Sequence, residues 1–164
     1  MIFRATRRVS SKLRVAYTDP NDSGVAMVEW YCNLMTVRRR QLFLLTHAPS
    51  LFSFWAPATG VTRGRFGQMF RQCATETLSD YGFSARDTMH VVDDGPDLFA
   101  KPTDRGVIGS MVDYGKMLRH TVDYAGGLER LGLRAMNDIA NECPMSKIGM
   151  EHPTRYLRRL LEHE

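Results

Sequence analysis

The sequence predicts an α+β domain: an antiparallel sheet of about four strands, from the N-terminal third, covered by helices from the C-terminal two-thirds. Two observations lead to this prediction. Segments with strand composition gather between residues 29 and 55, and stripes with helical spacing follow from residue 66 onward. The connections between the clustered strands are too short for crossover helices, so these strands should be antiparallel neighbours.

Length and composition are those of one globular domain. The chain has 164 residues, of which 43% are hydrophobic and 24% charged, so we predict a single α+β domain over residues 1–164. Three widely spaced cysteines without a C-x-x-C pair favour a reducing compartment, and we expect a cytoplasmic protein. No apolar run approaches the roughly 18 residues of a membrane helix, and the first residues lack the apolar region of a secretory signal.

The first third carries most of the predicted strands. Residues 2–5 form a plausible first strand, and Arg7 to Val15 a short helix with two apolar residues four apart. The segment from Asp19 to Gly24 is dense in turn-forming residues and predicts a loop. Three strands are then predicted, over residues 29–37, 41–47 and 51–55.

The rest of the chain is mainly helical. Apolar residues between Phe66 and Tyr81 share one helical face, and Gly82 is a natural stop. Ser84 is the expected N-cap of a short following helix. A short strand at residues 97–101 precedes three further predicted helices, whose apolar stripes span residues 107–122, 128–139 and 156–161.

Several short motifs resemble a known family. They are the opening strand with its basic helix, Trp30-Tyr31-Cys32-Asn33-Leu34, Val107-Ile108-Gly109-Ser110-Met111, and Asn141-Glu142-Cys143-Pro144. Together they are similar to a family of small bacterial proteins known only as a domain of unknown function, with a W-x-x-N-L strand, a V-x-G-S-M helix start and an N-E-x-P motif. The resemblance implies no activity, cofactor or catalytic residue.

Charge is distributed unevenly along the chain. Residues 1–75 hold eleven Lys and Arg against three acids, whereas residues 76–164 hold eleven against fifteen. A basic N-terminal half suggests a polyanionic partner, either nucleic acid or an acidic protein or ribonucleoprotein surface. The candidate partner-binding residues are Arg4, Arg7, Arg8, Lys12, Arg38, Arg39, Arg40, Arg63 and Arg65.

The leading hypothesis is a binding protein without enzymatic activity, cofactor or metal, of the kind that serves mobile elements or host defence. Guanidinium groups at a hairpin end could grip phosphates or carboxylates. The alternative for the run Arg38–Arg40 is a solvated turn that protects the sheet edge. Aromatic residues between Trp30 and Trp55 could stack on bases, but their apolar neighbours favour a place in the core.

Two other functions remain open at this stage. A small hydrolase-type enzyme could use His90 with the nearby carboxylates of Asp93, Asp94 or Asp97; the alternative is a favourable His at a helix C-terminus before a solvated loop. A protein-only regulator or inhibitor could instead dock through apolar surface on its C-terminal helices.

Overall fold

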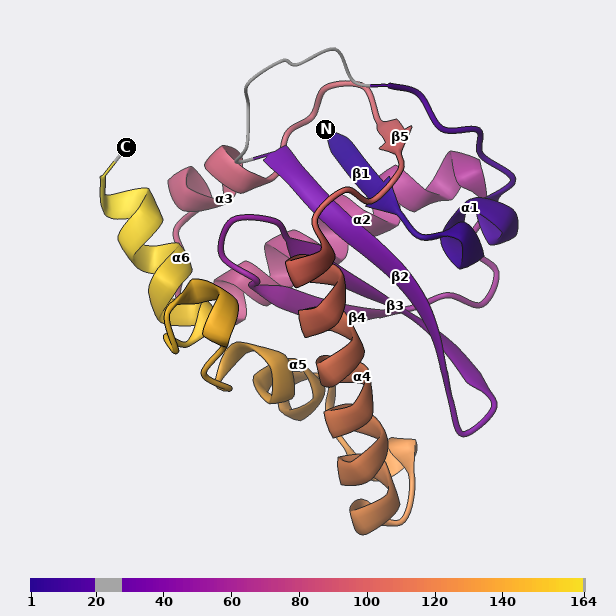
Figure 1. Ribbon diagram of the computed structural model, residues 1–164, viewed down its shortest axis with the longest axis vertical. Helices are drawn as coiled ribbons and strands as arrows, with labels where there is room; N and C mark the ends of the chain where they lie inside the picture. Colours follow the sequence, from indigo (N-terminus) through magenta and orange to yellow (C-terminus); the bar gives the residue numbers. More distant parts are fainter. Residues whose placement is uncertain (20–27, 164) are drawn as a thin grey trace.

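The computed structural model describes residues 1–19 and 28–163. Within them the chain forms one five-stranded sheet in the order β4-β3-β2-β1-β5, with helices on both faces (Figure 1). Apart from Asp19, the predicted loop 19–24 lies outside the described residues. The strands are β1 (Ile2–Ala5), β2 (Glu29–Val37), β3 (Arg40–His47), β4 (Ser53–Pro57) and β5 (Leu98–Ala100).

The sheet is mixed, so the prediction of a purely antiparallel sheet of four strands was wrong. β2, β3 and β4 are antiparallel neighbours as predicted, but β1 runs parallel to both β2 and β5. The reason is the connection over residues 6–28, which carries helix α1 (Arg7–Leu13) and is long enough to return the chain for a parallel pairing. β5 adds the fifth strand after two intervening helices.

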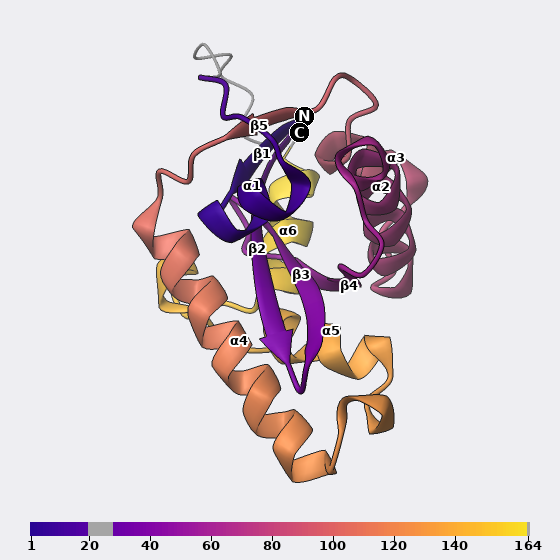
Figure 2. The ribbon, with the colours of Figure 1, turned by 90° about the vertical axis from the view of Figure 1, so that its right-hand side faces the viewer.

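The helices form a layer on each side of the sheet. Figure 2 shows α2 and α3 on one side of the sheet and α4 on the other. Helix α1 lies on the side of α2, because its Val9 and Leu13 belong to the same core cluster as Phe66 of α2. No helix of the described residues is both long and apolar enough to cross a membrane. The remaining bounds are α2 (Arg63–Asp80), α3 (Ala85–Val91), α4 (Arg105–Ala125), η2 (Leu128–Arg130), α5 (Leu133–Asn141), η3 (Ser146–Ile148) and α6 (Pro153–Glu162).

Alternation along the strands divides the core in two. On β2, Trp30 belongs to the cluster beneath α1, α2 and α3, whereas the next residue, Tyr31, belongs to the cluster beneath α4 and α5. Each strand of the sheet centre is therefore apolar on both faces. The aromatic residues that sequence analysis assigned to the core are buried, among them Phe43, Phe54 and Trp55.

Helix α4 buries most of its predicted apolar stripe, although Val112 is exposed. Val107, Met111, Tyr114, Leu118 and Val122 are buried on one face of the helix, with the spacing of three to four residues that such a face requires. The helix ends at Gly126, whose φ of 81° lies in the left-handed region that glycine adopts without steric cost. Ser84 caps α3 as predicted, in a reciprocal capping box with Asp87.

Helix α5 differs from its prediction in a way that explains how the sheet edge is closed. The expected helix over 128–139 is instead the short η2 followed by α5, whose buried face includes Asn137 and Asn141. Asn141 accepts a hydrogen bond from the Ser53 backbone N–H and donates one to the Ser53 carbonyl, both at 2.8 Å. Asn137 accepts from the Trp55 N–H at 3.0 Å. The two amides occupy backbone groups on the outer side of β4, which an additional strand would otherwise pair with.

Candidate functional site

The structure separates the nine candidate basic residues into three groups. Five of them lie on α1 and at the start of α2, and three lie in the hairpin that joins β2 to β3. Arg4 lies on β1 and is only 16% exposed. The single surface expected from the sequence is therefore not formed by all nine residues, and each group has different neighbours.

The groups on α1 and α2 share one side of the molecule. Val9 of α1 and Phe66 of α2 are buried in the same core cluster. Lys12 donates a hydrogen bond to the side chain of Gln41 at the start of β3, at 3.1 Å, and the Gln41 carbonyl accepts from the Ala58 N–H in the segment that leads into α2. Figures 1 and 2 agree in placing α1 and the start of α2 on this side. We name Arg7, Arg8, Lys12, Arg63 and Arg65 the α1–α2 basic surface.

This surface carries positive charge without neighbouring acids in its own segments. Its four arginines are exposed and Lys12 is partly exposed, and none of the five has an ion pair among the described residues. Residues 30–75 contain no Asp or Glu at all. The N-cap of α2, Thr62, makes no side-chain capping bond, so the first amides of this helix add a positive end to the same surface.

The hairpin arginines do not join the basic residues of α1 and α2 in one surface, as the sequence analysis had expected. Arg38 pairs with Asp123 near the end of α4, at 2.8 Å, so a carboxylate from the acidic half of the chain neutralises it. Arg40 lines an apolar groove with Leu128 and Glu129 on the α4–α5 side of the sheet. Arg38 and Arg39 both have positive φ, 45° and 68°, which matches a tight two-residue hairpin but is unfavourable for residues with a Cβ atom.

Arg4 does not belong to the α1–α2 basic surface. Its Nε donates to Glu29 at 2.7 Å, and its Nη1 donates to the Lys101 carbonyl at 3.1 Å. The alternation of β1 explains the difference, because Phe3 and Ala5 point into the core beneath α1 and α2 and Arg4 must point to the other face.

The loop after α3 is held by Arg71, which lies on α2. Arg71 is 21% exposed and makes a bidentate pair with Asp97, with distances of 2.6 and 3.2 Å. It also donates to the carbonyls of Asp93 and Gly95. The Asp97 carboxylate raises the pKa of Arg71. Two of the carboxylates considered for acid–base chemistry with His90 are thus engaged, Asp97 by Arg71 and Asp93 by the N-terminal ammonium at 3.5 Å.

Gly67 permits the close approach of this loop to α2. A methyl group at this position would overlap Asp97 Oδ2 and lie 2.7 Å from Arg71 Nη1.

We expect Gly67→Ala to lower the free energy of unfolding by about 1–3 kcal/mol, because it breaks the charged hydrogen bonds of Arg71. Gly109→Ala in α4 is the matched control: its Cβ would meet nothing within 4 Å, so it should stabilise by up to about 1 kcal/mol. Urea denaturation of both variants measures the difference, and a stabilising effect at Gly67 would contradict the role given to Arg71.

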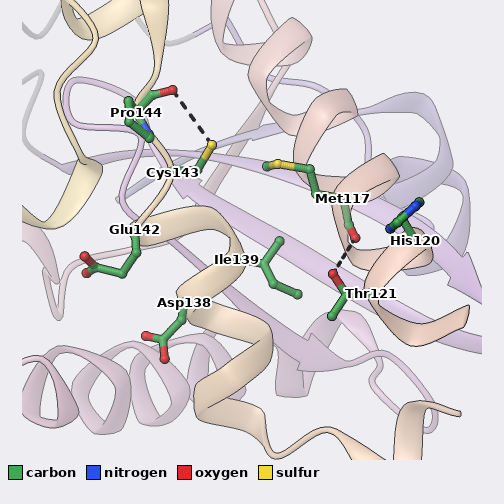
Figure 3. A pocket seen from close by; sticks show the side chains of 8 residues that line it. All are labelled: Met117, His120, Thr121, Asp138, Ile139, Glu142, Cys143 and Pro144. Atoms are coloured by element: carbon green, nitrogen blue, oxygen red, sulfur yellow. Dashed lines mark hydrogen bonds between the residues drawn. The ribbon is translucent and has the colours of Figure 1, made fainter. Parts of the chain in front are cut away.

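A further hollow lies between α4 and the end of α5 and contains Cys143 (Figure 3). The Cys143 thiol donates a weak hydrogen bond to the Pro144 carbonyl at 3.8 Å. Figure 3 shows Met117 between Cys143 and the His120 ring, which points away from the thiol, so the two do not form a nucleophile–base pair. Among the described residues, no three His, Cys, Asp or Glu side chains are grouped as a metal site requires.

Large apolar side chains exposed on the helices do not belong to one element. Met89 lies on α3, Val112 and Tyr124 on α4, and Leu133 on α5. Val112 and Tyr124 are twelve residues apart on the same helix, which corresponds to roughly 18 Å along its axis. These exposed residues are spread over three helices, and docking through the C-terminal helices stays a prediction.

The fold and this surface define a class: an α+β domain with a mixed five-stranded sheet, helices on both faces, and five cations on α1 and at the start of α2 that have no ion pair among the described residues. The model of one family, described as a domain of unknown function (DUF6933), matches residues 2–156. The chain belongs to this family. No curated protein matches it.

Proposed function

We propose that this protein binds nucleic acid through the phosphate backbone, using the α1–α2 basic surface. The observation that carries the proposal is the gathering on one side of five cations from two elements, which have no ion pair among the described residues and lie in segments without carboxylates. Four of the five are arginines, whose planar guanidinium groups match the geometry of phosphate oxygens. A surface of one sign suits a phosphate backbone better than a protein interface, where charges of both signs usually meet.

The buried aromatic residues limit how such binding could work. Trp30, Phe43, Phe54 and Trp55 are at most 1% exposed, so they are not available to stack on bases. Recognition would then rest on phosphate contacts, which position a protein but do not read sequence. We expect weak sequence preference, and an affinity in the range of non-specific binding, with a dissociation constant of about 10⁻⁴–10⁻⁶ M at physiological salt.

Salt dependence gives the proposal a quantitative test. With five phosphate contacts, the logarithm of the binding constant for duplex DNA should fall against the logarithm of salt concentration with a slope of about −4.5. Replacing Arg7, Arg8, Arg63 and Arg65 together with alanine should reduce this slope to about −1. Fluorescence anisotropy with labelled duplex DNA and single-stranded RNA, at several salt concentrations, measures both.

The control removes the same amount of charge elsewhere. A variant with alanine at Arg86, Arg119, Arg130 and Arg155, all exposed and outside the α1–α2 basic surface, should keep the wild-type slope. If both variants lose affinity equally, net charge and not this surface is responsible. Binding to polyglutamate but not to either nucleic acid would assign the surface to an acidic protein partner instead.

A further inference from the structure

A polar pocket lies on the opposite face of the sheet from the α1–α2 basic surface. It has a volume of about 530 Å³, within the range of sites for small molecules. Four segments far apart in the chain meet there: β1 with Arg4, the start of β2 with Glu29 and Tyr31, the residues before α4 with Asp104, and η3 with Lys147. The ring of Tyr156 from α6 also lines it.

The pocket contains two ion pairs that are partly removed from solvent. Arg4 Nε lies 2.7 Å from Glu29 Oε1, and their side chains are 16% and 20% exposed. Lys147 Nζ lies 2.7 Å from Asp104 Oδ2, with exposures of 29% and 43%. Two cations and two carboxylates therefore face one hollow, and their formal charges cancel.

The surrounding hydrogen bonds hold these groups in place. The Tyr31 hydroxyl accepts from the Asp104 N–H at 2.9 Å and lies 3.3 Å from the Thr103 hydroxyl. Asp104 Oδ1 accepts from the amides of Gly106 and Val107 at the start of α4. Contact with Lys147 lowers the pKa of Asp104, so this carboxylate stays ionised while it caps the helix.

Some bonding capacity in the pocket is not used within the protein. Arg4 uses Nε and Nη1, and Glu29 uses Oε1, which leaves Arg4 Nη2 and Glu29 Oε2 without a hydrogen bond among the described residues. Lys147 makes one hydrogen bond, to Asp104, of the three that an ammonium group can donate. One carboxylate oxygen and donors on two cations thus remain for a ligand.

We propose that this pocket binds a small zwitterion of the α-amino-acid type with an apolar side chain. A ligand carboxylate would bind Arg4 and Lys147 and its ammonium group Glu29, so both ligand charges gain partners without a net charge being buried. A phosphate or a simple amine carries charge of one sign only. The carboxylates of the pocket would repel a phosphate, and its two cations would repel an amine. Ala48, Pro49 and Ile148 supply an apolar wall for the side chain.

The first test uses the unmodified protein. Saturation-transfer NMR and calorimetry with L-leucine and L-phenylalanine should detect binding. Isoamylamine and 4-methylvalerate, which each lack one charged group of leucine, should bind at least tenfold more weakly. Absence of binding by both amino acids at millimolar concentration would overturn the proposal. Equal binding of leucine and either analogue would do so too.

Variants then assign the binding to this pocket. Glu29→Gln should weaken leucine binding at least tenfold and leave 4-methylvalerate binding unchanged, since that analogue has no ammonium group. Glu76→Gln on the exposed side of α2 is the matched control and should bind leucine like the wild type. Lys147→Met should weaken the binding of both ligands, and circular dichroism establishes that each variant is folded. If neither Glu29→Gln nor Lys147→Met changes leucine affinity, the ligand binds elsewhere and the assignment is wrong.

Discussion

Replacing Trp30 with alanine is expected to lower the free energy of unfolding by about 3–5 kcal/mol, a large part of the total stability of a domain of this size. Trp30 is fully buried at the centre of the sheet. Its ring meets Phe70 and Phe54 edge to face, with centroids 5.1 and 5.6 Å apart. Its Nε1 donates to the Val91 carbonyl at the end of α3, at 2.8 Å. The truncation would leave a cavity between β2, β4 and α2.

Two further variants separate the contribution of Trp30 packing to stability from that of its hydrogen bond to Val91. Trp30→Phe retains most of the aromatic contacts but leaves the buried Val91 carbonyl without its donor, so we expect a smaller loss of about 1–3 kcal/mol. Tyr124→Ala removes an aromatic ring that is 91% exposed and should change stability by no more than about 0.5 kcal/mol. Guanidinium denaturation followed by circular dichroism gives all three values. If Trp30→Ala cost no more than Tyr124→Ala, Trp30 would not be the centre of this core.

Replacing Asn141 with leucine is expected to have the second large effect. The side chain keeps a similar size, but the Ser53 N–H and carbonyl both lose their partners while they remain buried. At about 1–3 kcal/mol for each unsatisfied group, the expected loss is on the order of 2–6 kcal/mol. Separation of α5 from β4 would relieve these groups, and the outer edge of β4 would then pair with another copy of the chain.

Two measurements check this result. Denaturation reports the loss of stability, and light scattering after size-exclusion chromatography reports self-association of the variant at increasing concentration. Asn141→Asp keeps the acceptor for the Ser53 N–H and loses the donor to its carbonyl, so it should retain part of the edge protection. Gln68→Leu, which changes an exposed amide on α2, is the control. A stable, monomeric Asn141→Leu variant would show that the edge is closed by something other than this amide.

Residue composition, apolar spacing and capping residues predicted those helices and strands whose structure depends on neighbouring residues in the chain. β2 has the predicted bounds. The predicted apolar stripe lies within α4, because apolar residues that recur every three to four positions share one face of a helix. The capping box at Ser84 and Asp87 depends on residues three apart and could be predicted directly. The break at Leu131 and Gly132, between η2 and α5, was missed, since apolar residues before and after it continued a helical spacing.

Features that depend on distant partners could not be predicted in this way. The pairing of Arg38 with Asp123 joins residues 85 positions apart, and that of Arg71 with Asp97 joins α2 to the loop before β5, 26 positions further along the chain. The motif residue Asn141 shows the same limit, because its partner Ser53 is 88 positions away. A side-chain amide in a helix needs hydrogen-bond partners, but the sequence does not show which backbone groups these partners are.

By itself, the sequence determined the types of the elements, the burial of the aromatic residues and the excess of positive charge in the N-terminal half. These properties follow from residue type and local period, which do not depend on the path of the chain. Only the tertiary structure decided that β1 returns parallel to β2, that Arg4 faces Glu29 on the other side of the sheet, and that five cations share one side. The reason is that the direction of a side chain relative to a distant element is set by strand register and crossover connections, which local sequence does not specify.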